Sequence, residues 1–339
     1  MTAAAARLRY VDDTMPGIRR RRRGRYWQYF DDCGKRITDR AEIERLNAIG
    51  MPPAYRRVWL CPDPNGHIQA VGYDARGRRQ YRYHPGFRAK RDASKFERLV
   101  AFGRRLARLR KRLESDLAGD PTGFETVVAA VVSLIDASFM RIGNEEYARD
   151  NKSFGATTLR NRHATVTGHR IEISWPGKHG VKQAVSLTDR RLARVARRTQ
   201  ELPGQHLFEY VAADGKPRAI GSGEVNAYIQ EAMGEEFTAK DFRTWGASVI
   251  AFEQLARNDG EVRLKAMIEP VAEALGNTPT ISRNSYVHPA LVAAAQDKAA
   301  AGPFELPRAT KYLAPAERGL IAFLETAGRG RKAGTSGRR

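Results

Sequence analysis

Tyr286 lies in a short basic segment, residues 276 to 286, of a chain whose formal net charge is +21. Gly276 ends one helical pattern, and Thr278 and Pro279 supply the N-cap and first position of the next. A tyrosine hydroxyl in such surroundings is a candidate nucleophile for a phosphodiester, because positive groups favour the charged oxygens of that ester. Taken alone, the segment is a helix-turn-helix corner, where a tyrosine more often packs or contacts a phosphate passively.

Two other segments carry arginines that suit the same chemistry. Arg141 comes directly after a long apolar helical pattern and two residues before a glycine, which mounts it rigidly. Thr238 and Asp241 fit a capping box, so Lys240 and Arg243 share a face near the positive end of a helix dipole. Guanidinium groups fit the phosphoryl oxygens, over which charge spreads in the transition state. Ordinary helix ends with solvated charges show the same local patterns.

A hairpin and a loop offer two more groups. Lys178 lies at the tip of a predicted β-hairpin, residues 176 to 180. Such a turn can bring a lysine into a groove, where neighbouring cations lower its pKa toward the range of a general acid. Most turn lysines only add solubility. Asn277 can donate an amide hydrogen to a phosphate oxygen, and Arg283 shares a helix face with Tyr286.

Composition indicates a polyanionic partner, which we interpret as nucleic acid. The 339 residues include 59 Lys and Arg against 38 Asp and Glu, and the pI is about 10.3,. The longest apolar run, residues 127 to 135, is too short to cross a bilayer,. Only Cys33 and Cys61 occur, which supports neither a disulfide framework nor a cysteine zinc site. We expect a cytoplasmic, nucleoid-associated protein with no membrane partner.

Two domains are expected from the length and from the change of pattern along the chain. Residues 1–88 predict a β-rich DNA-binding domain, and they hold 19 Lys and Arg against 9 Asp and Glu. Residues 89–327 predict a mainly helical catalytic domain that contains a small antiparallel sheet. A Gly/Arg-rich tail, residues 328–339, is predicted to be disordered. The fold class is therefore α+β.

Two features of the first domain leave alternatives open. Tyr81 and Tyr83 alternate with Arg82, so both tyrosines point to one side of their strand. They contact bases or sugars in a groove, or they form the inner face of a small sheet. The run from Arg19 to Arg23 is a phosphate-binding arm or a solvated charge run, and the net charge favours the arm.

Together, in this order and spacing, the segments resemble the catalytic signature of type IB DNA topoisomerases of the poxvirus-like and bacterial group. The resemblance covers nearly the whole chain, and a chance match to every piece in order is very improbable. The matching pieces are Gln80-Tyr81-Arg82-Tyr83, Arg141-Ile142-Gly143 with Tyr147, Asn151-Lys152, Gly155-Ala156-Thr157-Thr158-Leu159, Lys178, Lys240-Asp241-Phe242-Arg243-Thr244, and Thr278-Pro279 through Ser285-Tyr286.

The resemblance implies that Tyr286 attacks the scissile phosphate, keeps the 3′ phosphoryl end and releases a 5′ hydroxyl. Arg141 and Arg243 would clamp the non-bridging oxygens, and Lys178 would protonate the leaving oxygen. Many family members have histidine where this chain has Asn277, which cannot titrate, so we assign Asn277 transition-state hydrogen bonding only. The expected DNA contacts are Tyr81, Tyr83, Tyr147, Lys240 and Arg283.

Such an enzyme relaxes positive and negative supercoils as a monomer, and the resemblance implies two lobes that close around duplex DNA as a C-shaped clamp. Exchange of a phosphodiester for a phosphotyrosyl ester is nearly balanced in energy, so we expect neither ATP nor a metal. A Walker-type loop and a convincing carboxylate cluster for magnesium are both missing from the sequence.

Two alternatives remain at this point: a site-specific tyrosine recombinase and a non-catalytic helix-turn-helix DNA-binding protein. Recombinases commonly have histidine at the position of Lys240, three residues before the second arginine. A protein that only binds gives no reason for Arg141, Lys178 and Arg243 to accompany Tyr286.

Overall fold

The computed structural model describes residues 8–177, 180–234, 237–297 and 304–336, with the side chains of residues 88–93 and 328–336 excepted. The chain forms two compact units, Met1–Lys95 and Phe96–Arg339. Helix α2 (Pro85–Glu97) runs across this division, and the boundary expected from the sequence, between residues 88 and 89, lies within the same helix.

The first unit is built on a five-stranded sheet with the order β2-β1-β3-β4-β5, in which each adjacent pair is antiparallel. One face packs around Ile18, Tyr29, Leu60 and Ala70, together with Leu46 from helix α1 (Arg40–Ala48). The prediction of a β-rich amino-terminal part is confirmed. The strands are β1 (Ile18–Arg23), β2 (Tyr26–Phe30), β3 (Arg56–Leu60), β4 (Ile68–Tyr73) and β5 (Arg79–Tyr83).

The arginine run is strand β1. Its register pairs Arg19 with Phe30 and Arg21 with Gln28 of β2. Arg20 lies with its guanidinium carbon 4.0 Å from the centroid of the Trp27 ring, and it donates a hydrogen bond of 2.8 Å to the carbonyl of Met51. The run is therefore a paired strand of the sheet rather than a free arm.

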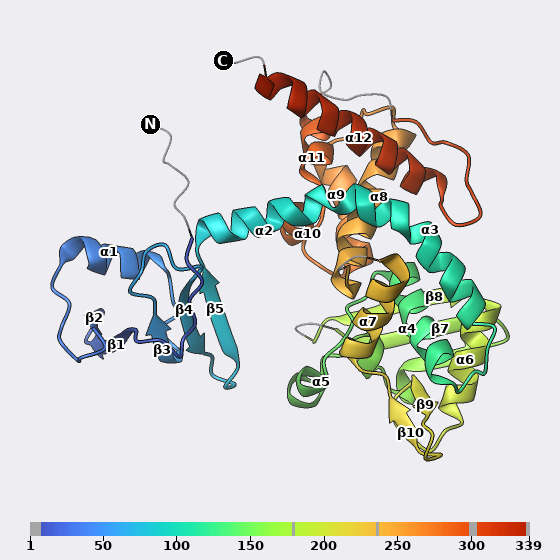
Figure 1. Cartoon of the computed structure of the whole chain (residues 1–339), viewed down its shortest axis with the longest axis horizontal. Coiled ribbons are helices and arrows are strands. Elements are labelled where there is room, and N and C mark those ends of the chain that lie inside the picture. Colours follow the sequence, from blue (N-terminus) through green and yellow to red (C-terminus); the bar gives the residue numbers. More distant parts are fainter. Residues whose placement is uncertain (1–7, 178–179, 235–236, 298–303, 337–339) are drawn as a thin grey trace. The chain divides into compact units, whose positions relative to one another are not determined.

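The second unit is mainly helical, as expected (Figure 1). Helices α3 and α4 both contribute to one large apolar core, in which α4 buries every side chain from Val127 to Val132. These helices are α3 (Leu99–Asp116), α4 (Phe124–Ser138), α5 (Glu145–Asn151), α6 (Arg190–Gln200), α7 (Ser222–Met233), α8 (Ala239–Arg257), α9 (Leu264–Leu275), α10 (Pro279–Ser285), α11 (Pro289–Gln296) and α12 (Pro315–Ser336).

Two small antiparallel sheets interrupt the helices. The larger has the order β6-β7-β8, so the predicted hairpin gains a third strand, β6, that the sequence analysis missed. Ile171, Ile173 and Trp175 of this sheet point into the core, as their alternation predicted. The strands are β6 (Ala164–Thr167), β7 (Arg170–Pro176) and β8 (Lys182–Thr188), with β9 (Glu209–Val211) and β10 (Pro217–Ala219) in the second sheet.

The carboxyl-terminal segment differs from expectation. Helix α12 extends to Ser336 and so includes most of residues 328–339, for which the composition predicted disorder. Its earlier turns pack Leu320, Phe323 and Leu324 into the core. Adding residues to a helix that is already formed needs no new nucleation, which accounts for its continuation through a Gly/Arg-rich stretch. Within the described part of the chain, no helix is long and apolar enough to cross a membrane.

A buried ion network joins four helices of the second unit. Arg110 on α3 contacts Asp136 on α4 and Glu317 on α12, each at 2.7 Å, and Trp245 on α8 donates a hydrogen bond to Glu317 at 3.1 Å. Burial raises the pKa of Glu317, but the hydrogen bonds and charge of Arg110 outweigh burial and lower it. Because an unfolded glutamate has a pKa near ~4.3, this contribution is complete at neutral pH and declines as the pH falls below that value.

We predict that Arg110→Ala lowers the free energy of unfolding by roughly 3–5 kcal/mol at neutral pH, because it leaves two buried carboxylates without their cation. Arg104 is the control: it lies on the same helix, pairs with Glu325 at 2.6 Å and has a side chain that is 65% exposed. Arg104→Ala should cost about 0–1 kcal/mol. Equal losses in chemical denaturation would contradict a special role for the buried network.

Candidate active site

Tyr286 lies at the end of helix α10, where it is the C-cap residue. Its backbone N–H donates to the carbonyl of Ser282 at 3.0 Å. Gly276 ends α9 with a left-handed φ of 57°, and Thr278 caps α10 by accepting a hydrogen bond from Ile281. The predicted helix boundaries are confirmed, but Tyr286 follows the last helical residue instead of lying within the helix.

Arg243 is buried beside Tyr286, with only 4% of the residue exposed. It donates hydrogen bonds to the carbonyl of Phe139 at 2.5 Å and to the carbonyl of Leu275 at 2.9 Å. Those two carbonyls belong to the C-terminal ends of α4 and α9. The guanidinium carbon lies 5.1 Å from the centroid of the Tyr286 ring. Arg243 is therefore fixed at one orientation under the tyrosine.

Arg141 and Asn277 meet in the same region. Nη2 of Arg141 donates a hydrogen bond of 2.8 Å to Oδ1 of Asn277. Because arginine only donates, this bond turns the amide nitrogen of Asn277 the other way. That nitrogen and Nε of Arg243 are buried without a hydrogen-bond partner among the described residues. An unpaired buried donor costs about 1–3 kcal/mol, so both atoms are suited to an incoming acceptor.

The backbone that carries Arg141 is held by residues 155–158. Ala156 donates to the carbonyl of Arg141 at 2.9 Å, and Thr157 donates to the carbonyl of Ile142 at 2.7 Å. The approach is so close that a Cβ on Gly155 would lie 2.4 Å from the carbonyl oxygen of Arg141. Residues 155–158 therefore fix the position of the loop from which the side chain of Arg141 extends.

The positive charges change the pKa values of both Arg243 and Tyr286. Burial, followed by the neighbouring charge of Arg141, lowers the pKa of Arg243 to about 10. Burial raises the pKa of Tyr286, but the charges of Arg243, Arg141 and Lys240 outweigh it, so the net pKa is below the usual value. The cluster therefore favours an anion, either a phenolate or a bound phosphate.

A pocket of about 400 Å³ opens onto this cluster. Arg141, Lys240, Arg243 and Tyr286 face one space, although they come from three separate parts of the chain. The lining contains no carboxylate among the residues that the structure describes. The lining residues are Arg141, Ile142, Gly143, Asn144, Tyr147, Ser153, Phe154, Ala239, Lys240, Arg243 and Tyr286.

The predicted general acid has no described position, because Lys178 and the adjoining His179 lie outside the described residues. The base of their hairpin does contact the site. A Cβ on Gly276 would lie 2.0 Å from Oε1 of Gln183 on β8, so this strand packs directly against the loop that precedes Asn277.

The remaining predicted DNA contacts fall into two groups. Tyr147, which is 41% exposed, and Lys240, at the start of α8, line the pocket. Arg283 is exposed on α10 and is not among the described lining residues. Tyr81 and Tyr83 belong to the first unit, where their rings stack at 5.9 Å with an angle of 13° between the planes. Among the described residues, neither joins the apolar core of that unit.

The carbonyls of Phe139 and Leu275, which accept from Arg243, were not predicted from the sequence. Phe139 has a left-handed φ of 53°, and Gly246 on α8 makes room for its ring, since a Cβ there would lie 2.4 Å from the ring atoms. A helix that ends without glycine, as α4 does, is a weak signal in the sequence. Only the fold shows that its last carbonyls face Arg243.

One group of side chains has the composition of a metal site. Asp31, Asp32 and Cys33 place possible ligand atoms within 4.8 Å of one another on the exposed turn after β2. Asp31 accepts a hydrogen bond from the backbone of Lys35 at 2.7 Å, and Asp32 accepts one from the backbone of Cys33. Both carboxylates therefore serve the turn itself.

A half-buried tyrosine beside Arg243, with Arg141 lining the same pocket, suits a phosphoryl-transfer enzyme whose nucleophile is a tyrosine. Residues 84–311 match the family described as eukaryotic DNA topoisomerase I, catalytic core. Residues 26–74 match the bacterial DNA topoisomerase IB, N-terminal domain. The chain belongs to the type IB DNA topoisomerases, which are isomerases. This assignment favours the topoisomerase over the recombinase and over a protein that only binds.

Viral relatives agree with the family. DNA topoisomerase 1B of Acanthamoeba polyphaga mimivirus is 32% identical over 288 residues, which are 80% of this chain and 85% of the relative. DNA topoisomerase I of monkeypox virus is 24% identical over 239 residues, 67% of this chain and 72% of the relative. A structure of XerH site-specific recombinase bound to difH substrate has a TM-score of 0.36 and 20% identity, covering 53% of this chain and 49% of that one.

We predict that Gly155→Ala lowers the free energy of unfolding by about 1–3 kcal/mol, because the added methyl group meets backbone that cannot move aside cheaply. Formation of a covalent adduct with DNA should fall as well, since the displaced carbonyl belongs to Arg141. Gly223→Ala on α7 is the control, as no atom lies within 4 Å of its added Cβ. The control should be unchanged or more stable by less than about 1 kcal/mol. If Gly155→Ala changed neither the free energy of unfolding nor adduct formation, the close contact between Gly155 and the Arg141 backbone would not matter for the site.

Proposed function

We propose that this protein relaxes positive and negative supercoils in duplex DNA by cleaving and rejoining one strand, with Tyr286 as the nucleophile. The observation that carries the proposal is the convergence of Tyr286, Arg141 and Arg243 on one pocket, with Asn277 bonded to Arg141. The family assignment supplies the type of reaction, and the convergence supplies the residues.

In the cleavage step, the bond between Oη of Tyr286 and phosphorus forms while the bond to the 5′ oxygen breaks. The phenol proton passes to solvent water, and the leaving 5′ oxygen gains a proton from Lys178, a role that rests on the family resemblance. Arg141 and Arg243 donate to the non-bridging oxygens, and the amide nitrogen of Asn277 adds a donor. The products are a 3′-phosphotyrosyl ester and a 5′ hydroxyl.

Rejoining is the same step in reverse, in which the 5′ hydroxyl attacks the phosphotyrosyl ester. One phosphate ester replaces another, so the cycle needs no ATP. The charges that a metal ion would supply are present as Arg141, Arg243 and Lys240 around the pocket. We therefore expect relaxation without a metal cofactor.

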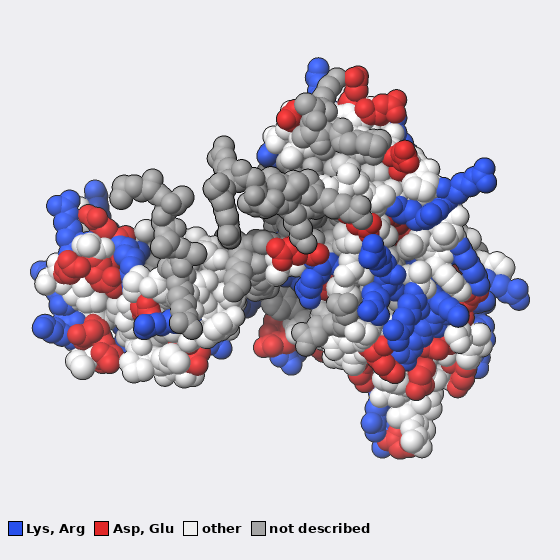
Figure 2. Space-filling model, turned by 45° about the horizontal axis from the view of Figure 1, so that its top comes forward, with Lys and Arg blue, Asp and Glu red and all other residues white. Residues whose placement is uncertain are grey.

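Duplex DNA, preferably supercoiled, is the proposed substrate. Tyr147 and Lys240 line the pocket and would contact the strand near the scissile phosphate, and Arg283 is exposed on the helix that carries the nucleophile. Tyr81 and Tyr83 lie outside the core of the first unit and offer stacked rings to a groove. Lysine and arginine side chains are spread over the surfaces of both units (Figure 2). We propose a monomer that acts in the cytoplasm, on the nucleoid.

We predict that the protein relaxes plasmid in excess EDTA and that Tyr286→Phe abolishes relaxation. The variant lacks only the hydroxyl, so it should still bind DNA while forming no covalent adduct after quenching with denaturant. Adduct is measured with labelled duplex on a denaturing gel, with the label placed on each side of the cleavage site in turn. An adduct in the variant, or one attached to the 5′ end, would show that the mechanism is misassigned.

We predict that Asn277→Ala slows adduct formation by about 10²–10³-fold at saturating DNA, which is typical for loss of one donor to a developing oxyanion. The substitution also removes the hydrogen bond that holds Arg141. Asn284→Ala, an exposed asparagine on α10, is the matched control and should change the rate less than about twofold. If both variants match the wild type in single-turnover cleavage, Asn277 has no part in the chemistry.

A further inference from the structure

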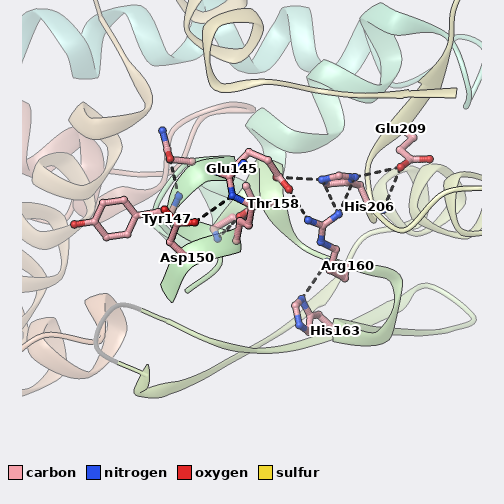
Figure 3. Close-up of polar contacts among 11 residues, drawn as sticks. Glu145, Tyr147, Asp150, Thr158, Arg160, His163, His206 and Glu209 are labelled. Carbon is pink, nitrogen blue, oxygen red and sulfur yellow. Dashed lines mark hydrogen bonds and ion pairs between the residues drawn. The ribbon is translucent and has the colours of Figure 1, made fainter. Parts of the chain in front are cut away.

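A polar network lies behind the pocket wall that carries Tyr147 (Figure 3). Glu145, in the first turn of α5, accepts a hydrogen bond from Arg160 at 2.5 Å and lies 3.2 Å from Nε2 of His206. The other ring nitrogen of His206 is 3.3 Å from Glu209. Arg160 also contacts the His206 ring, at 2.8 Å from Nε2. Four side chains from distant parts of the sequence therefore form one connected group.

The base of this network is rigid. Arg160 and His206 are joined by a β-bridge, and Leu207 donates to the carbonyl of Leu159 at 2.9 Å. Glu209 is only 6% exposed, and it also accepts a hydrogen bond from the backbone of His206 at 3.1 Å. A Cβ on Gly204 would lie 1.6 Å from Oε2 of Glu209, so glycine leaves the room that this carboxylate fills.

Helix α5, in contrast, contributes little to the apolar core. It is 7 residues long, and Ala148 is its only buried side chain. A helix of this length is not stable without tertiary contacts. Its N-cap Asn144 and its residue Tyr147 line the active-site pocket, while Glu145 between them contacts the network. The helix is thus fixed on one side by Glu145 and presents Tyr147 on the other.

We propose that Glu145, Arg160, His206 and Glu209 are positioning residues that hold α5 so that Tyr147 faces the DNA strand at the pocket. None of the four lines the pocket in the described part of the chain, so they act through Tyr147 and not on the phosphate. The proposal rests on the proposed function of the pocket. Burial opposes ionisation of Glu145, but the hydrogen bond of His206 and the charge of Arg160 outweigh it and lower the pKa of Glu145, as expected for a carboxylate held by these partners.

The chain provides a matched pair of carboxylates for the test. Glu145 and Glu146 are adjacent exposed residues in the first turn of α5 and have the same favourable interaction with the helix dipole,. Of these two carboxylates, Glu145 contacts Arg160 and His206, whereas no such contact is found for Glu146 in the described part of the chain. We expect Glu145→Gln to slow adduct formation at saturating DNA by about tenfold, as small displacements of positioning groups do. Glu146→Gln should stay within about twofold.

A double-mutant cycle tests whether the network acts through Tyr147. If it does, Glu145→Gln combined with Tyr147→Ala is no slower than Tyr147→Ala alone, because the helix then has no side chain left to position. A general structural defect would instead make the two losses multiply. Multiplying losses, or equal effects of Glu145→Gln and Glu146→Gln, would overturn the proposal.

A second measurement needs no DNA. Hydrogen exchange of the α5 amides in the free protein should become faster in Glu145→Gln and stay unchanged in Glu146→Gln, because only the first change loosens the helix. Unchanged exchange in Glu145→Gln would refute the anchoring even if cleavage slows. A wild-type protein that forms no adduct would refute the proposed function, whereas the exchange result would still decide the anchoring.

Discussion

The candidate active site depends on the buried guanidinium of Arg243, whose hydrogen bonds go to backbone carbonyls at the C-terminal ends of two helices. Arg243 gives its hydrogen bonds to the last carbonyls of α4 and α9, and the C-terminal end of a helix carries partial negative charge. A charge in the interior costs several kcal/mol unless it is hydrogen-bonded. Those carbonyls meet this need without neutralising the arginine. The cation therefore keeps its charge beside Tyr286, and the same two bonds join α8 to the ends of α4 and α9.

Arg110 is a buried arginine whose charge is neutralised by carboxylates, in contrast to Arg243. It is also largely buried in the second unit, but it contacts two carboxylates, Asp136 and Glu317, which raise its pKa despite burial. Arg243 has no carboxylate partner within the described residues, and its pKa is lowered by burial and by Arg141. The first arginine is electrostatically complete and only stabilises the fold. The second has no carboxylate partner among the described residues, and a bound anion would supply the missing negative charge.

Local signals in the sequence predicted the helix ends around Gly276, Thr278 and Pro279, because caps and turns depend on neighbouring residues. These local signals did not predict contacts between residues that are far apart in the sequence. The bond from Arg243 to Phe139 spans 104 residues, and no periodicity or cap reports such a contact. Strand β1 was missed because five arginines hide its alternation, which becomes visible only when Arg20 is found against Trp27. The family resemblance predicted that the site residues act together, and the structure gives their arrangement around one pocket.

The centre and the edge of the pocket are built differently. The backbone of Arg141 is held by close contact with Gly155, and the side chain of Arg243 is held by carbonyls in the core, so the protein itself sets both positions. Tyr147 is carried by a short helix that has one buried side chain, Ala148, and that contacts the polar network through Glu145. Preorganised cations stabilise the transition state without rearrangement during the reaction. Local opening of this edge would disturb little of the core, whereas the two arginines keep their positions, so the centre and the edge of the pocket differ in stability.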